Sequence, residues 1–260
     1  MAPSRTTAVG NVLFRFRSFT PVPVIALALF LLWRSRGEPG PGGASVDALL
    51  DVTGLVLALL GQALRFYTLG LVPEGTSGQG NALEAVTLNT RGPYAFVRNP
   101  LYVGNLGICL GLLLIAHDPI VYVLGLGFFF GEYFFIIRAE ENFLRSRFGA
   151  AFDEFCRRVP RWVPRFSPAY EGHLRVGFDV KRALKKEHNP FAAWASGALI
   201  LWGWERWARG ELALSGDSTA LWVLVVLQVS VLFLFVGIKG WKHRWLRRGR
   251  PGNQAAPSSR

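Results

Sequence analysis

Residues 91–104 read RGPYAFVRNPLYVG, a polar segment with two prolines that lies between two strongly apolar runs. Gly92-Pro93-Tyr94 predicts a tight turn, because proline fixes its own backbone angle and glycine tolerates unusual ones. Pro100 predicts the start of a helix, since proline is tolerated in the first helical turn. The segment therefore predicts a chain reversal at a membrane boundary, with polar side chains concentrated there.

The apolar residues outside this segment form runs instead of the scattered pattern of a soluble core. A transmembrane helix needs about 20 apolar residues, with about 17 as a minimum. The runs cover residues 20–33, 46–71, 102–116, 120–137, 190–207 and 220–238. We therefore predict an all-α integral membrane protein with about six transmembrane helices, or five if one of the short runs does not cross.

A second polar segment follows the fourth run, where Glu140 and Glu141 precede a helical pattern. Apolar residues recur at helical spacing at Leu144, Phe148, Phe152 and Phe155. This pattern predicts an amphipathic helix at the cytoplasmic interface, with the two glutamates at its head. Taken alone, such glutamates are usually a solvated face.

Orientation follows from lysine and arginine, which accumulate in cytoplasmic loops. Basic residues precede the first run, fill residues 138–186 and follow the last run. With six spans, these segments and the 91–104 loop share one face, which we predict to be cytoplasmic; Arg34 and Arg36 argue mildly against this assignment. A bacterial inner membrane is favoured over the endoplasmic reticulum.

The net charge of +12 does not come with a nucleic-acid-binding motif, so attraction to anionic lipid headgroups explains it better. No nucleic-acid partner is predicted. Two cysteines cannot build a zinc site by themselves, and the histidines lack ligand spacing along the chain. No metal is predicted. The histidines are His117, His173, His188 and His243.

Arg65, near the end of the second run, has two interpretations. An arginine there is costly unless it extends to the interface or finds a partner. It is either an ordinary interfacial arginine or part of a buried polar pocket. Together with Arg98, the positive N-terminal end of the third span and the Glu140-Glu141 pair, it predicts a site for a zwitterionic ligand such as an amino acid.

These segments resemble the integral-membrane methyltransferases that include isoprenylcysteine carboxyl methyltransferase and phosphatidylethanolamine N-methyltransferase. The resemblance covers roughly residues 48–168 and rests on four motifs in order. They are Gly61-x-x-Leu64-Arg65, Gly92-Pro93-Tyr94-x-x-x-Arg98-Asn99-Pro100-x-Tyr102-x-Gly104, Glu140-Glu141-x-x-Leu144-x-x-x-Phe148-Gly149, and Phe155-x-x-x-Val159-Pro160-Arg161.

The resemblance implies S-adenosylmethionine as methyl donor and a lipid or lipid-like acceptor in the bilayer. It implies that Arg98 and the start of the third span face the donor's carboxylate, and that Glu140 or Glu141 faces its ammonium group. Arg147 is implied to orient the substrate, with Glu140 and Glu141 as further catalytic candidates and Arg65 on the substrate side. The implied donor-binding residues are Tyr94, Arg98, Asn99, Pro100, Tyr102, Gly104, Glu140 and Glu141.

The carboxyl methyltransferases typically have histidine where this chain has Asn99, and this difference argues against a general base at that position. Two other functions remain open. Membrane sterol reductases share a similar Arg-x-Pro-x-Tyr pattern and use NADPH, and a noncatalytic lipid-binding protein would keep the same spans.

Three regions follow from these observations. Residues 1–47 are predicted to form an N-terminal anchor span and a flexible loop at 37–44. Residues 48–168 form the methyltransferase core. Residues 169–260 form a basic segment, a transmembrane hairpin and a disordered tail. The similarity of His188-Asn189-Pro190 to Arg98-Asn99-Pro100 is treated as chance.

Overall fold

The computed structural model describes residues 5–17, 22–34, 42–73, 83, 85–171, 177–210, 212 and 219–248. Within these residues the chain is helical and has no strand, which confirms the all-α prediction. Most of the loop predicted at 37–44 and the whole of the predicted tail at 249–260 lie outside them. The helices are α1 (Arg5–Phe16), α2 (Val22–Arg34), α3 (Gly43–Leu71), the 3-10 helix η1 (Gly92–Ala95), α4 (Pro100–Ala116), α5 (Pro119–Phe148), α6 (Ala150–Arg158), α7 (Val180–Ala208) and α8 (Thr219–Arg248).

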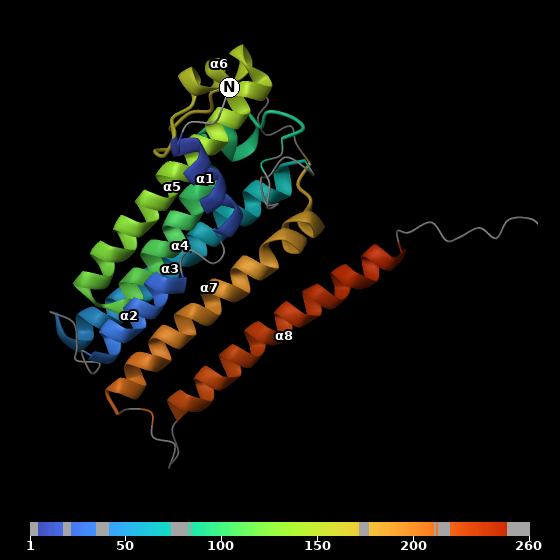
Figure 1. Cartoon of the computed structure of the whole chain (residues 1–260). Helices are drawn as coiled ribbons and strands as arrows, with labels where there is room; N and C mark the ends of the chain where they lie inside the picture. The colour runs from blue at the N-terminus through green and yellow to red at the C-terminus, as the bar shows by residue number, and fades with distance from the viewer. Residues whose placement is uncertain are drawn as a thin grey trace, which may run out of the picture.

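The long helices lie roughly side by side and form one bundle (Figure 1). Among the described residues, three segments are long and apolar enough to cross a membrane, namely Gly43–Leu71, Pro119–Phe148 and Thr219–Lys242. Ile25–Arg34 and Pro100–Ala116 are apolar but shorter. The chain is therefore a helical membrane protein, while the number of spans stays a prediction.

Helices α3 and α4 approach closely because glycines face each other along their contact. A β-carbon on Gly104 would lie 2.5 Å from Cγ of Arg65 and 2.7 Å from the carbonyl oxygen of Gly61. Further along the same contact, a β-carbon on Gly111 would meet the carbonyl oxygen of Gly54 and lie 2.8 Å from Cβ of Ala58. Small residues let helix backbones approach in this way in membrane proteins.

The 91–104 segment has the predicted turn and helix start. Gly92 opens η1 with a φ of 58°, a left-handed conformation that glycine adopts readily, and α4 begins at Pro100. The segment after α6 then crosses this loop and pairs with its backbone. The amide of Arg98 donates to Pro160 O at 2.8 Å, and the amide of Ala169 donates to Ala95 O at 2.8 Å.

The second polar segment differs from the prediction. Helix α5 continues without a break to Phe148, so Glu140 and Glu141 lie in its last third and do not begin a separate helix. The chain breaks at Gly149, whose φ is 52°, and α6 then folds back. The predicted apolar stripe does pack, because Phe152, Phe155 and Val159 are buried against Leu144, Phe148 and Tyr94, among others. The periodicity of the sequence did not indicate this break, because the stripe of apolar residues continues on both sides of Gly149.

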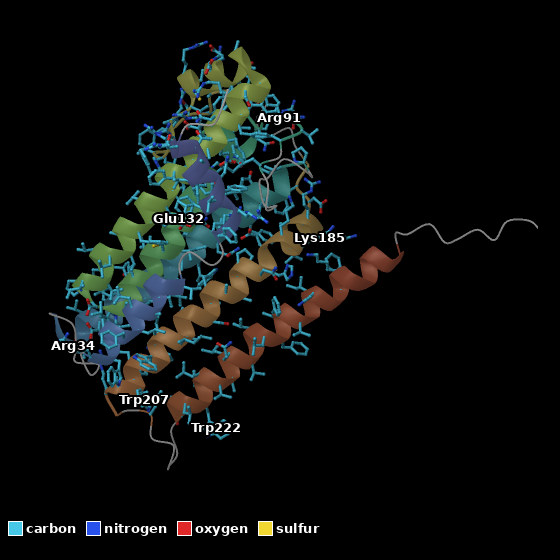
Figure 2. The ribbon with its side chains drawn as sticks, in the orientation of Figure 1. Arg34, Arg91, Glu132, Lys185, Trp207 and Trp222 are labelled. Carbon is cyan, nitrogen blue, oxygen red and sulfur yellow. The ribbon has the colours of Figure 1, made fainter. Side chains whose placement is uncertain are left out.

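Helix α7 packs on α3, α4 and α8, whereas α8 packs mainly on α7. In Figure 2, Arg91 and Lys185 lie at one end of the bundle, and Arg34, Trp207 and Trp222 lie at the other. We call the first of these the cavity end and the second the far end.

Candidate functional site

A cavity of about 470 Å³ lies at the cavity end, between the 91–104 loop, α5 and α7. Small-molecule sites in proteins are typically about 300–1,000 Å³. Of the residues predicted from the sequence, six line this cavity: Arg65, Tyr94, Arg98, Asn99, Tyr102 and Glu140. The 91–104 loop, α3 and α5 therefore meet in space at the cavity.

Among the described residues that line the cavity, Glu140 is the only one that carries a carboxylate. Its Oε2 accepts a hydrogen bond of 2.8 Å from the hydroxyl of Tyr102. The ring of Tyr102 lies 4.8 Å from that of Tyr133, centroid to centroid. Burial, with the charge of Glu140 adding to it, raises the pKa of the Tyr94 phenol well above its usual value. The cavity therefore combines one carboxylate with two tyrosines, and the Tyr94 phenol stays neutral at physiological pH.

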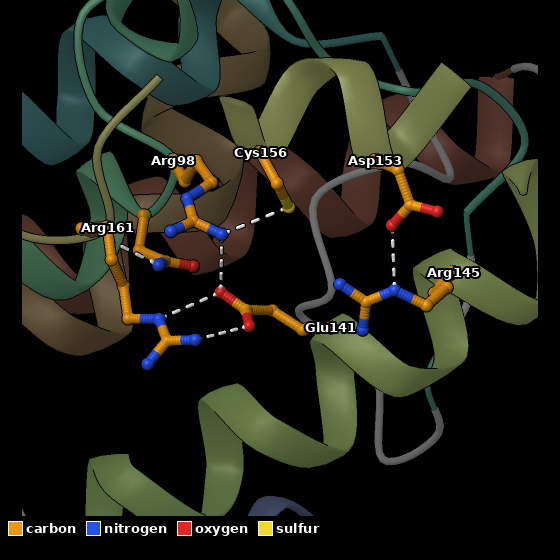
Figure 3. A network of polar contacts seen from close by, with 7 residues as sticks. Arg98, Glu141, Arg145, Asp153, Cys156 and Arg161 are labelled. Atoms are coloured by element: carbon orange, nitrogen blue, oxygen red, sulfur yellow. Dashed lines mark hydrogen bonds and ion pairs between the residues drawn. The ribbon is translucent and has the colours of Figure 1, made fainter. Parts of the chain in front are cut away.

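Glu141 does not line the cavity, because arginines hold it on the side facing the 159–161 segment (Figure 3). Arg161 binds it with two hydrogen bonds, Nε to Oε1 at 2.9 Å and Nη2 to Oε2 at 2.6 Å. Nη1 of Arg98 donates to Oε1 of Glu141 at 3.1 Å and to Sγ of Cys156 at 3.0 Å. Arg98 therefore lines the cavity while Glu141 fixes its guanidinium from behind.

Arg65 is buried and paired, so it is not an ordinary interfacial arginine. Its Nε and Nη2 donate to the two carboxylate oxygens of Glu187 at 2.9 and 2.6 Å. Its Nη1 donates to Oδ1 of Asn105 at 2.5 Å, and Nδ2 of Asn105 donates to the Tyr133 hydroxyl at 2.6 Å. Glu187 is only 2% exposed. These bonds connect α3, α4, α5 and α7 at the wall of the cavity.

The other predicted site residues lie outside the cavity lining. Pro100 starts α4, and Gly104 provides the space that the Arg65 side chain occupies. Arg147 is exposed, with its guanidinium 6.0 Å from the ring centroid of Phe148, and its substrate-orienting role stays a prediction. Asn99 lines the cavity but directs its Nδ2 to Arg161 O at 3.2 Å.

Several cavity residues were not predicted. Glu187 and Asn105 complete the Arg65 network, and basic residues from distant helices complete the lining. The basic residues that line the cavity are Arg17, Arg65, Arg98, Lys185, Lys186 and Lys242. Asn105 lies three residues after Tyr102, which places it on the same helical face and was a usable signal. Asn189 and Pro190 also line the cavity, so the second Asn-Pro pair is part of the site.

The arrangement suits a ligand with an anionic group and a smaller cationic part. Basic side chains outnumber carboxylates among the described lining residues, so an anion is the favoured main contact. Glu140, with the faces of Tyr94 and Tyr102, is suited to an ammonium or sulfonium group, because cations bind carboxylates and aromatic faces.

Comparisons with known proteins identify a matching family and two similar proteins. The model of the phospholipid methyltransferase family matches residues 50–151. The chain is 35% identical over 163 residues to the cobalt-zinc-cadmium resistance protein CzcN of Cupriavidus metallidurans, which covers 62% of this chain and 69% of the relative. It is 35% identical over 85 residues to the nickel-cobalt-cadmium resistance protein NccN of Alcaligenes xylosoxydans xylosoxydans, covering 32% of this chain and 39% of that protein.

No solved structure matches the chain. The matched family region contains Arg65, Tyr94, Arg98, Tyr102 and Glu140, the core of the cavity lining. Taken with the helical membrane fold and the extent of the match to the first relative, this shows that the chain belongs to the phospholipid methyltransferase family.

Proposed function

We propose that the protein transfers a methyl group from S-adenosylmethionine to an amphiphile embedded in the membrane. The observation that carries this proposal is the cavity itself, where the family region brings one carboxylate, two tyrosines and two arginines together at a bundle end. When bound, S-adenosylmethionine supplies an electrophilic methyl group on a positively charged sulfur.

The residues present fit such a donor. Arg98 lines the cavity and suits a carboxylate, because guanidinium groups bind carboxylates through charge-assisted hydrogen bonds. Arg65 also lines the cavity, but its paired donors are taken by Glu187, so it contributes to donor binding by holding the cavity wall in place. Glu140 suits the ammonium group, and Tyr94 and Tyr102 suit the sulfonium. Glu141 acts on the donor only through Arg98, whose guanidinium it holds. This assignment places Glu140 in direct contact and makes Glu141 a positioning residue.

The acceptor in this proposal is an isoprenylcysteine-like carboxylate or a phospholipid amine. A carboxylate acceptor needs no proton removed before it attacks. An amine acceptor must lose its proton, and Glu140 is the carboxylate placed to take it. The side chains of Leu101, Phe143 and Leu144 add apolar surface to the cavity wall for the adjoining part of the acceptor.

We further propose that the cavity opens on the cytoplasmic side of a bacterial inner membrane. The support is the distribution of lysine and arginine, which gather at the cavity end on α5, α6 and the start of α7. A single cysteine at exposed Ala151 should then react with an impermeant reagent only in inside-out vesicles. Reaction in intact spheroplasts would reverse the orientation.

Donor binding is tested by calorimetry on detergent-purified protein. Glu140→Gln and Arg98→Ala should each weaken S-adenosylmethionine binding by about thirtyfold or more, since losing one member of a desolvated charge pair costs about 2–5 kcal/mol. Glu141→Gln should also weaken binding, because it releases Arg98. Glu154→Gln is the matched control, because Glu154 lies in exposed pairs on α6 and outside the cavity. Unchanged binding in folded Glu140→Gln and Arg98→Ala would remove the proposed donor site.

The same measurement with NADPH separates the methyltransferase from a membrane reductase, because only the reductase should bind it.

Acceptor class is tested in mixed micelles with amphiphiles that share a headgroup and differ in chain length. Each buried methylene contributes about 0.8 kcal/mol, so specificity constants should rise with length. Equal turnover of a short soluble analogue would favour a small-molecule methyltransferase instead.

A second candidate role comes from the names of the relatives, which associate those proteins with resistance to cobalt, zinc, cadmium and nickel. We propose that this chain contributes to growth in the presence of the same metals. A deletion strain should then grow less well than its parent at raised cobalt or zinc, and complementation should restore growth. Equal growth of the two strains would end this candidate.

A further inference from the structure

A second cluster of titratable side chains lies at the far end of the bundle, away from the cavity. Asp47 near the start of α3, His117 between α4 and α5, and Glu205 near the end of α7 are brought together there, and each is less than a tenth exposed. Asp47 and Arg65 are 18 residues apart on one helix. At 1.5 Å per residue, the cluster is roughly 27 Å from the cavity wall.

The distances place nitrogen and oxygen atoms around one point. Nδ1 of His117 lies 2.9 Å from Oε1 of Glu205 and 4.0 Å from Oδ2 of Asp47. One potential ligand atom from each of the three residues lies within 4.8 Å of the others. Imidazole nitrogen and carboxylate oxygen are ligands that zinc and related divalent ions accept, with bonds of about 2.0–2.2 Å.

The other ring nitrogen of His117 faces a fourth residue, Asp51, one turn after Asp47. Nε2 lies 3.2 Å from Oδ1 of Asp51, and neither atom makes a hydrogen bond within the described part of the chain. The imidazole is 4% exposed. Metal-binding histidines usually direct their second nitrogen to a carboxylate, which fixes the ring and increases its basicity. Asp51 is placed for this role.

The charges also favour a divalent cation. Three carboxylates and the guanidinium of Arg209 meet at the cluster, where Arg209 contacts Asp47 at 2.9 Å and also contacts Glu205. Among these described groups the carboxylates outnumber the cations, so the cluster carries net negative charge whether or not the imidazole is protonated. A buried imbalance of this kind is unfavourable unless a cation neutralises it.

We propose that His117, Glu205 and Asp47 bind one divalent transition-metal ion of the zinc class, with Asp51 supporting His117 from behind. The proposal rests on the geometry of the far end alone and is independent of methyl transfer at the cavity. Among the described residues, the ligands come from three helix ends that are remote in sequence. This explains why histidine spacing along the chain gave no signal.

Two other cations compete for the same oxygens. One is the proton on His117: burial by itself lowers the pKa of His117, but the Asp51 and Glu205 carboxylates outweigh burial and raise the pKa to about 10. The other is the guanidinium of Arg209, which contacts two of the three ligand residues. A bound metal must displace the proton and share or displace the guanidinium. A substitution of Arg209 therefore distinguishes a metal site from an ion-pair network, because it removes one of the competing cations.

The test uses the full chain in detergent, stripped with a chelator and titrated with Zn²⁺ by calorimetry and with Co²⁺ by visible absorption. Wild type should bind one equivalent of each, with a Co²⁺ spectrum typical of nitrogen and oxygen ligation. His117→Gln should weaken binding by about a hundredfold or more, and Asp51→Asn by about 10–100-fold, as expected for a supporting carboxylate. His188→Gln, which changes a buried histidine at the cavity end, should bind like wild type.

Arg209→Gln gives the sharpest outcome, because removing a competing positive charge should tighten binding by about tenfold. A misfolded variant cannot produce such a gain, so the result does not depend on how well the other variants fold. If wild type binds no Zn²⁺ or Co²⁺ at millimolar concentration, or if His188→Gln loses the ion as His117→Gln does, the proposal is overturned. Weaker binding in Arg209→Gln would also overturn it and would show that the cluster is an ion-pair network only.

Discussion

The two ends of the bundle both gather buried charge, but they do so differently. The cavity end surrounds open space of about 470 Å³ with a surplus of basic side chains. At the far end, His117, Asp47 and Glu205 contact each other and Arg209 directly, with a surplus of carboxylates. Space with surplus positive charge suits the exchange of an anionic ligand. Close contact with surplus negative charge suits a small cation that stays in place.

The two ends also differ in how many ion-pair partners each charged side chain has. At the cavity end, Glu187 is the carboxylate that pairs with Arg65 among the described residues. At the far end, His117 faces more than one carboxylate, and Arg209 contacts both Asp47 and Glu205. Loss of one acidic residue should therefore be more damaging at the cavity end.

The largest expected effect tests this difference. Glu187→Ala leaves the Arg65 guanidinium buried without its carboxylate, and breaking a buried pair in this way costs about 3–5 kcal/mol of unfolding free energy. Glu205→Ala should cost less, about 1–3 kcal/mol, because Asp47 and Asp51 still face the two cations. Denaturant unfolding in mixed micelles measures both. Equal losses would mean that the two networks are equally redundant.

An intermediate loss of stability is expected from changes in the contact between α3 and α4, which extends between the two ends of the bundle. Gly111→Ala should destabilise the protein by about 1–3 kcal/mol, because the new methyl group meets the backbone of α3 and cannot be accommodated by a side-chain rotation. Gly104→Ala should cost at least as much, because its added carbon meets the carbonyl oxygen of Gly61 and Cγ of Arg65, a side chain that hydrogen bonds to Glu187 and Asn105 hold in place.

Gly127→Ala on α5 is the control for both glycines, because its added carbon meets nothing within 4 Å. Alanine favours a helix over glycine by up to about 1 kcal/mol, so this change should be neutral or stabilising. Thermal unfolding in one detergent compares the three variants. A loss in Gly127→Ala as large as that in Gly111→Ala would show that the effect does not come from the α3–α4 contact.

The smallest effect separates the two ion pairs drawn in Figure 3. Arg145 and Asp153 form a pair of 2.8 Å, but both side chains are nearly half exposed. Asp153→Asn should therefore change stability by less than about 1 kcal/mol, as is usual for surface pairs. Glu141→Gln should cost more, because Glu141 is buried behind Arg98 and accepts from two arginines. The same unfolding assay decides, and a larger loss for Asp153→Asn would reverse the ranking.

The helical fold and much of the cavity could be predicted because their signals are local. Apolar runs indicated the long helices, and Pro100 marked the start of α4. Tyr94, Arg98, Tyr102 and Glu140 lie in short motifs and do line the cavity. The predicted roles of these residues remain proposals, since their placement alone does not test them.

The remaining features depend on contacts between segments that are far apart in sequence. Glu187 is 122 residues from Arg65, and no local motif in the basic stretch around it marks it as a partner of that arginine. Glu140 and Glu141 differ in their surroundings because Arg161, 20 residues after Glu141, forms a hydrogen bond with Glu141 and leaves Glu140 on the cavity side. The break at Gly149 was hidden because an apolar stripe continues on both sides of it.

The position of α8 affects the cavity through Lys242. This lysine lines the cavity, yet its helix packs mainly on α7 and leaves most of its apolar surface exposed to the surroundings. Helices in a bilayer adjust their tilt when the hydrocarbon thickness changes. A tilt of α8 would move the Lys242 ammonium relative to the other basic groups while α3, α4 and α5 stay in contact. We therefore expect the electrostatic attraction of the cavity for an anionic ligand to change with the thickness of the membrane around it.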